Sequence, residues 1–107
     1  MNDEERIYSF IGLAAKANKV VSGGEMCEKA LKGKNVRMVI IAQDAADSTV
    51  NIFNNLCNKK SVIPIRFGNK EELGNIIGKA GSRSVLCITC KNFASRLQEM
   101  IAVQFRG

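Results

Sequence analysis

Two of the four cysteines stand three residues apart, as Cys87-Ile88-Thr89-Cys90. A CxxC pair serves thiol–disulfide exchange when it lies at a helix N-terminus, because helix amides lower the thiol pKa. Here the pair falls within an apolar segment typical of a strand, on which side chains three apart point to opposite faces. Zinc would need a second pair at similar spacing, and Cys27 and Cys57 do not provide one. We therefore interpret the cysteines as small buried hydrophobes, and we expect neither a metal nor another cofactor.

The carboxylates and glycines give weaker signals. Asp44 follows the apolar segment 36–42, where α/β enzymes often carry a catalytic carboxylate, but it suits the N-cap of a helix better. The chain has no His, which excludes His-based acid–base catalysis, and it has no dinucleotide-binding or Walker motif. Gly23 and Gly24 precede a predicted helix, at which backbone N–H groups can hold a phosphate. These patterns predict a protein that is not an enzyme.

Positive charge is in excess and is unevenly distributed. Sixteen Lys and Arg face ten Asp and Glu, so the net charge is +6 and the pI is about 9.4. Such a domain is attracted to polyanions, although the charge alone is equally explained by solubility. One group of cations comprises Lys16, Lys19, Lys29, Lys32, Lys34 and Arg37, and it can equally be a solvated helix face. Lys79 and Arg83 flank a glycine-containing loop, and for such loops contact with a polyanion is favoured.

Aromatic side chains are few. Tyr8, Phe10, Phe53, Phe93 and Phe105 fall in helical patterns, mostly at core positions, and only Phe67, near a strand end, is a candidate for stacking on a base. Proteins that bind single strands without sequence preference use such stacking platforms. The composition therefore favours structured RNA that is read through its backbone shape.

The start of the chain predicts a cytoplasmic protein. Asp3, Glu4 and Glu5 are acidic where a secretion signal is basic, and no run of about 18 apolar residues could span a membrane. In the cytoplasm the four thiols would be reduced.

Residues 1–107 are expected to form a single domain, since neither a repeat nor a linker interrupts them. Hydrophobic periodicity predicts helices at 3–17, from Ser22 or Gly23 to 33, at 44–57, after Asn69 and at 92–104, alternating with strands at 20–21, 36–42, 62–67 and 84–90. Capping boxes are expected at Asn2–Glu5, Ser22–Glu25 and Asn69–Glu72, and the inner face of the second helix at Met26, Ala30 and Leu31. Pro64 places its strand at a sheet edge or itself at the strand start. The order α-β-α-β-α-β-α-β-α predicts a sheet covered by helices on both faces, and alternation alone favours a parallel sheet.

Five blocks follow one another in a specific order and spacing: IGLAAKANKVVSGGE, KAL, VRMVIIAQDAADST, LC and LGNIIGK. In these blocks, from about residue 10 to 97, the chain resembles the ribosomal protein L-seven-Ae / L-thirty-e family, and most of all its short bacterial members. The resemblance implies an α-β-α sandwich around a four-stranded mixed sheet. It also implies binding to kink-turn RNA, a sharply bent helix with sheared G·A pairs, in a ribosomal, ribosome-associated or riboswitch setting.

The resemblance further implies three RNA-binding segments. The first is the entrance to the second helix, with Gly23, Gly24, Glu25, Met26, Lys29 and Lys32. The second is the turn after the central strand, with Gln43 and Asp44. The third is the loop before the last strand, with Ile77, Gly78, Lys79, Ala80, Gly81, Ser82, Arg83 and Ser84. Asp44 follows a strand and Arg83 precedes one, so they share a rim only if those strands are antiparallel, which overrides the parallel expectation.

In this interpretation the amides of Gly23 and Gly24 hold phosphates and the cations add charge. Ile77 and Ala80 cover an extruded base, and polar groups near Glu25 face guanine edges. The chain has Glu25-Met26 where the strongest kink-turn readers have Asn-Glu. The alternative is a protein–protein interaction module of the same fold, against which the basic charge argues. We expect a monomer.

Overall fold

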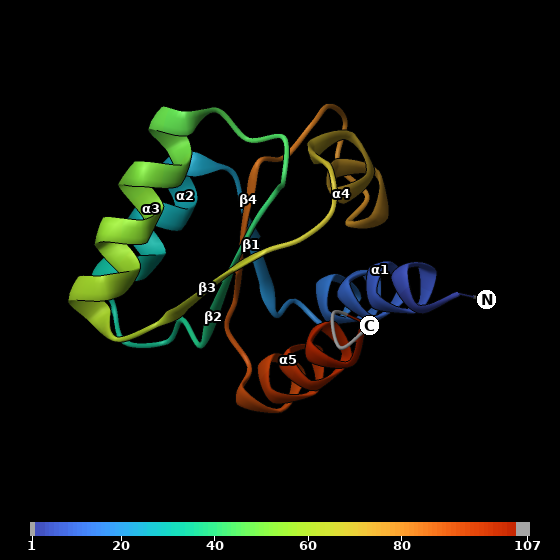
Figure 1. Ribbon diagram of the computed structural model, residues 1–107. Coiled ribbons are helices and arrows are strands. Elements are labelled where there is room, and N and C mark those ends of the chain that lie inside the picture. The colour runs from blue at the N-terminus through green and yellow to red at the C-terminus, as the bar shows by residue number, and fades with distance from the viewer. Residues whose placement is uncertain (1, 105–107) are drawn as a thin grey trace.

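The computed structural model describes residues 2–104, and within them five helices alternate with four strands (Figure 1). The elements are α1 Asp3–Lys16, β1 Val20–Ser22, α2 Gly24–Lys32, β2 Met38–Ile41, α3 Asp47–Lys60, β3 Ile63–Arg66, α4 Lys70–Ile76, β4 Val85–Ile88 and α5 Lys91–Gln104. The predicted order of helices and strands is confirmed. Phe105, predicted to fall in a helical pattern, lies outside the described residues.

The sheet is mixed, with the strand order β1-β4-β2-β3. Strand β4 is antiparallel to both β1 and β2, whereas β2 and β3 are parallel. The four-stranded mixed sheet is thus confirmed, and the parallel sheet that alternation alone favoured is wrong. Pro64 lies in β3, which is an edge strand, as predicted. An edge strand pairs with a neighbour on one side only, so it tolerates a residue that has no N–H.

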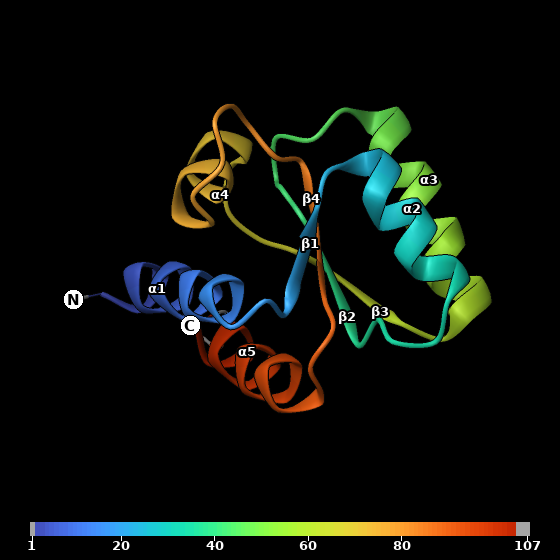
Figure 2. The same ribbon diagram turned by 180° about the vertical axis from the view of Figure 1, so that it is seen from behind.

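Helices cover both faces of this sheet. Figures 1 and 2 show α2 and α3 against one face and α1, α4 and α5 against the other. The central strands β2 and β4 are buried throughout, and successive side chains supply two separate cores. Met38 and Ile40 pack with α1 and α5, while Val39 and Ile41 pack with α2 and α3. This arrangement is the predicted α-β-α sandwich.

Two of the three predicted helix caps form. Asn2 accepts a hydrogen bond from the Glu5 amide at 2.8 Å, and Asn69 accepts one from the Glu72 amide at the same distance. The prediction of a capping box formed by Ser22 and Glu25 is wrong. Gly23 is the N-cap of α2 with a φ of +90°, which glycine adopts readily, and no side chain caps the helix. Ser22 is instead the last residue of β1, and its hydroxyl accepts a hydrogen bond from Arg83.

Asp44 does not cap the third helix. That helix begins at Asp47, with Ala46 as its N-cap. The Asp44 carboxylate instead accepts a hydrogen bond from the Lys70 amide at 2.9 Å, in the first turn of α4. The carboxylate thus satisfies a helix terminus that is distant in sequence, because the ends of β2 and β3 are neighbours.

Two predictions of side-chain burial are also wrong. On α2, Cys27 and Leu31 face the core, whereas Met26 is 54% exposed, because the helix starts at Gly24 and presents the i, i+4 pair inward. Phe67 is buried against Tyr8, with ring centroids 5.0 Å apart, so it cannot stack on a base. Among residues 2–104, no helix has the length and apolar character needed to cross a membrane.

Candidate nucleic-acid interface

Four segments meet at one end of the sheet, at the top of Figures 1 and 2. They comprise residues 22–26, 42–49, 66–71 and 78–85, which we call the rim. The antiparallel pairing of β2 with β4 brings the end of one to the start of the other, and the Ala42 amide donates to the Ser84 carbonyl at 2.8 Å. The Gly23 amide donates to the Val85 carbonyl at 3.0 Å. The antiparallel relation required to join Asp44 and Arg83 is therefore confirmed.

Two helices begin at this rim without side-chain caps. The first-turn amides of α2, from Gly24 to Met26, and those of α3, from Asp47 to Thr49, have no acceptor within their own helices. Such amides, together with the positive end of the helix dipole, attract anions. The amide of Gly23, predicted to hold a phosphate, is already used by Val85. The available donors therefore begin one residue later, and α3 adds a second set that the sequence did not reveal.

Arg83 links the first predicted segment to the third. Its Nε donates to the Ser22 hydroxyl at 3.3 Å, and its Nη1 donates to the carbonyls of Ser82 at 2.9 Å and Ala80 at 3.4 Å. Guanidinium has five N–H donors, so Arg83 can hold the loop and still contact a ligand. Beside it lies a hollow of about 400 Å³, lined by Ser22, Gly23, Gly24, Thr49, Ser82, Arg83, Ser84 and Val85.

The second predicted segment borders a neighbouring hollow of about 620 Å³. It is lined by Asp44, Asn69, Lys70, Glu71, Asn75, Gly81 and Ser82, so Ser82 contributes to both hollows. Gln43 is held in place by Arg66, whose Nη2 donates to the Gln43 carbonyl at 2.9 Å. The start of the first predicted segment, the second segment and the third consequently lie on one continuous surface.

The loop before β4 is supported by a close glycine contact. A Cβ at Gly74 would collide with the carbonyl oxygen of Gly81 and would lie 3.3 Å from the Cα of Ser82. The loop itself turns at Gly78 and Gly81, which have φ values of +77° and +87°. Lys79 and Ala80 are exposed on it, whereas Ile77 is partly buried and packs against the core on the α1 side of the sheet.

Lys29 and Lys32 do not belong to the rim. Both lie in the last turn of α2, and at 1.5 Å per residue they are about 7.5 and 12 Å along the helix axis from Gly24. The Lys32 carbonyl instead accepts a hydrogen bond from Lys60 at 3.4 Å, at the C-terminal end of α3. Without Lys29 and Lys32, the rim has as many cations as carboxylates and therefore no net side-chain charge. The cations are Arg66, Lys70, Lys79 and Arg83, and the carboxylates are Glu25, Asp44, Asp47 and Glu71.

Sequence reasoning missed Thr49, Arg66 and Lys70 at this surface. Arg66 ends a strand, and strand ends of parallel neighbours meet at one edge, so the pattern contained a signal for it. Thr49 and Lys70 carried none, because each lies in the first turn of a helix whose position depends on tertiary packing.

The burial predicted for the cysteines is confirmed for three of them and is wrong for Cys90, because β4 ends at Ile88 and Cys90 directly precedes α5. Cys27, Cys57 and Cys87 are buried together under α2 and α3, whereas Cys90 is partly exposed at the start of α5. A hydrogen bond with the Cys87 thiol, followed by burial, raises the pKa of Cys27 well above its ordinary value. The Phe93 and Asn92 amides, with Lys19 and Arg37, lower the pKa of Cys90. Within residues 2–104, no three His, Cys, Asp or Glu side chains are placed to hold a metal.

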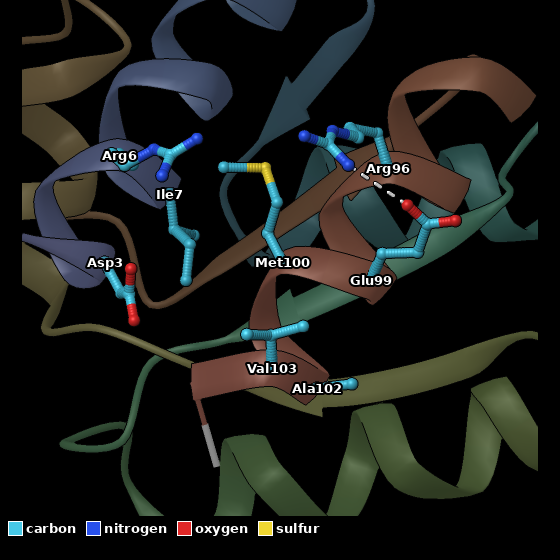
Figure 3. A pocket seen from close by; sticks show the side chains of 8 residues that line it. All are labelled: Asp3, Arg6, Ile7, Arg96, Glu99, Met100, Ala102 and Val103. Atoms are coloured by element: carbon cyan, nitrogen blue, oxygen red, sulfur yellow. Dashed lines mark hydrogen bonds and ion pairs between the residues drawn. The ribbon is translucent and has the colours of Figure 1, made fainter. Parts of the chain in front are cut away.

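A groove of about 470 Å³ lies elsewhere, between α1 and α5 (Figure 3). It is bordered by Asp3 and Arg6 on α1 and by an exposed ion pair, Arg96–Glu99 at 3.1 Å, on α5. In Figure 3, Ile7 and Met100 extend into the space between the two helices. The charges are mixed and exposed, so the groove shows no preference for an anion.

The fold and the rim together define a class of protein: an α-β-α sandwich with loops and helix N-termini exposed at one end of a mixed sheet. The family model described as "Ribosomal protein L7Ae/L30e/S12e/Gadd45 family" matches residues 5–98, and the chain belongs to this family. The resemblance inferred from the sequence blocks is thereby confirmed.

Named relatives and solved structures agree with this assignment. The RNA-binding protein YlxQ of Bacillus subtilis (strain 168) is 30% identical over 94 residues, which cover 88% of this chain and 93% of YlxQ. The protein of the same name from Enterococcus faecium is 25% identical over 92% of this chain and 94% of its own.

Among solved structures, a protein of unknown function from Bacillus halodurans C is 30% identical, with a TM-score of 0.85, and the match covers 90% of this chain and 96% of that one. The Giardia lamblia 15.5kD RNA binding protein shares the fold, with a TM-score of 0.78 at 19% identity, over 96% of this chain and 88% of its own.

Proposed function

We propose that the chain binds structured RNA of the kink-turn type through the rim, as a monomeric, single-domain ribosomal or ribosome-associated protein of the cytoplasm. The support is the family membership of the chain and its 30% identity to a protein named as RNA-binding. The observation that carries the proposal is the joining of two uncapped helix N-termini and Arg83 around one hollow.

The groups at the rim suggest a division of labour. The amides of Gly24, Glu25 and Met26 would hold phosphates, and Arg83 and Lys79 would add charge. Ala80 is exposed on the loop and would cover an extruded base. Gln43 and Asp44 would border the bend. The remaining loop residues, Gly78, Gly81, Ser82 and Ser84, would follow the RNA backbone.

The Glu25 side chain is available to contact RNA because it does not take part in a helix cap. Because the Ser22–Glu25 box does not form, the exposed Glu25 carboxylate is not engaged in a helix cap. A carboxylate accepts hydrogen bonds only, and guanine presents N–H donors on its minor-groove edge. Glu25 would therefore face the guanines of the G·A pairs, in the place where strong kink-turn readers carry Asn.

The proposed activity is binding without catalysis. The chain has no His, and three of its four thiols are buried in a core. The carboxylate Asp44 is bonded to a backbone amide in the first turn of α4. We therefore expect these groups to serve the fold and not a reaction.

A gel-shift salt series tests the function directly, with a kink-turn RNA, the same RNA with its G·A pairs disrupted, and a plain duplex. We expect tighter binding to the intact kink-turn at every salt concentration and a steep fall of affinity with salt. Equal affinity for the three RNAs would contradict the proposal.

Arg83 provides the mutational test. Arg83→Ala should weaken kink-turn binding by about 1 kcal/mol or more, because it removes a cation and releases the loop from Ser22. Arg83→Lys keeps the charge but loses the planar fork, and it should recover part of the affinity only. Arg6→Ala, on the α1 side of the sheet, is the control and should bind as wild type. Wild-type affinity in Arg83→Ala would show that the rim is not the RNA surface.

A further inference from the structure

The net positive charge of the chain does not come from the rim, where cations and carboxylates balance. It is concentrated at the opposite end of the α2–α3 layer, where the two helices finish side by side (Figures 1 and 2). Lys32 ends α2, Lys34 follows it, and Lys59 and Lys60 end α3. We call these four residues the lysine end.

Tertiary structure brings the two halves of this cluster together. The Lys60 Nζ donates to the Lys32 carbonyl at 3.4 Å, across 28 residues of sequence. All four lysines are exposed, and the sequence contains no Asp or Glu from 29 to 43 or from 48 to 70. The ion pair found among residues 2–104 is Arg96–Glu99, on another helix, so within the described part of the chain no lysine of this cluster is held in an ion pair, and the nearest acidic residue in sequence is Glu28, one turn before Lys32 on α2.

Lysines in a last helical turn also interact favourably with the helix dipole. That effect accounts for one or two cations at each terminus and falls off within the turn. It does not account for Lys34, which lies beyond the α2 C-cap Gly33, nor for the absence of acidic residues on both connecting segments.

A polar path joins the lysine end to the rim along α3. Thr49 lines the rim hollow, and Lys59 lies at the far end of the same helix. At 1.5 Å per residue, the distance along the axis from Thr49 to Lys59 is about 15 Å. Between them, Asn51, Asn55 and Asn58 follow helical spacing on one face, and all three are exposed. Their amides can donate to phosphates, and none of them repels an anion.

We propose that the lysine end is a second RNA-backbone contact, which binds an arm of the RNA that leaves the rim along the outer face of α3. This inference rests on RNA binding at the rim. The two contacts differ in kind: the rim would select the bend by its geometry, while the lysine end would supply charge that neutralises phosphates regardless of sequence.

The test compares a short kink-turn RNA that covers the rim only with RNAs in which each arm in turn is lengthened by one helical turn. Binding is measured over a salt series for the wild type and for the double variant Lys34→Gln/Lys59→Gln. Neither side chain in this variant makes a hydrogen bond with another residue of the described chain, so folding should be unchanged, which thermal unfolding verifies.

We expect the wild type to bind one of the longer RNAs more tightly than the short RNA. The double variant should lose this gain, and the slope of log K against log salt should fall by about two with that RNA and stay unchanged with the short one. Arg6→Gln/Arg96→Gln removes the same charge from the α1–α5 face and is the matched control, which should retain the gain.

The inference is overturned if arm length has no effect on the wild type, or if both double variants lose the same affinity. In either case selective binding of the short kink-turn RNA would leave the function of the rim intact. Absence of that selectivity in the wild type would instead contradict the proposed function, whatever the lysine variants do.

Discussion

The two ends of the α2–α3 layer differ in the groups that they would offer to a polyanion. At the rim, the donors are backbone amides of two helix N-termini and one arginine that is bonded to Ser22 and to its own loop. At the other end, the helices finish in exposed lysines on flexible stems. Fixed amides require a ligand of matching shape, whereas lysine ammonium groups adapt to any phosphate. If both proposals hold, shape selection and charge attraction are separated by the length of one helix.

The largest effect should come from breaking the support of the rim. In Gly74→Ala, the added methyl group would collide with the carbonyl of Gly81, so the loop 78–84 must move away from α4. We expect a loss of about 1–3 kcal/mol in the free energy of unfolding, typical of overpacking, together with loss of kink-turn selectivity. Denaturant unfolding and the gel-shift series measure the two consequences.

Gly24→Ala is the matched control for this glycine. Outside its own helix and its chain neighbours, no atom lies within 4 Å of the place that the added methyl group would occupy. Alanine is also the better helix former, so stability should be retained or rise by up to about 1 kcal/mol. Binding should nevertheless weaken, because the methyl group stands beside the first-turn amides. If Gly74→Ala kept both stability and selectivity, the loop would not depend on its contact with α4.

A smaller effect is expected from Asp44. Its carboxylate bonds the Lys70 amide at 2.9 Å, so Asp44→Ala should cost about 1 kcal/mol of unfolding free energy, the usual value of a helix cap. Asp44→Asn keeps an acceptor oxygen and should recover most of it. RNA affinity should change less than in Arg83→Ala, since the role of Asp44 in the fold is to position the rim. Equal stability of the Ala and Asn variants would contradict this role.

The last effect is absent at neutral pH and concerns the layer that holds the two ends apart. Burial, followed by the nearby Cys87, raises the pKa of Cys57 from its ordinary 9.0 to about 11. The folded protein therefore retains a proton that the unfolded chain releases first, so this contribution is complete below pH 9.0 and is lost as the pH rises toward about 11. The denaturant midpoint should fall through this window, and less so in Cys57→Ala. A midpoint that did not change with pH would show that the buried thiols do not titrate with unfolding.

Much of this molecule follows from local sequence. Apolar periodicity predicted the order of helices and strands, because each element must bury one face or stripe. Asn2 and Asn69 indicated where two helices start, because each side chain accepts a hydrogen bond from the amide three residues later in the sequence. Three of the four segments of the rim were predicted from sequence blocks that resemble a family. The sequence alone did not reveal that Phe67 is buried in the core, that Glu25 is not part of a helix cap, or that Lys32 lies at the end of α2 that is far from the rim.

Those features depend on contacts between residues that are distant in the chain. Ser22 bonds Arg83 rather than Glu25, Asp44 caps α4 rather than α3, and Lys60 reaches Lys32, each across 26 or more residues. Local patterns specify which groups need a partner. Which partner they receive is decided by strand order and helix packing, since a polar group bonds whatever acceptor or donor the fold brings to it. Composition thus determined that the chain is basic, and only the tertiary structure determined that the lysine end and the rim lie at opposite ends of the α2–α3 layer.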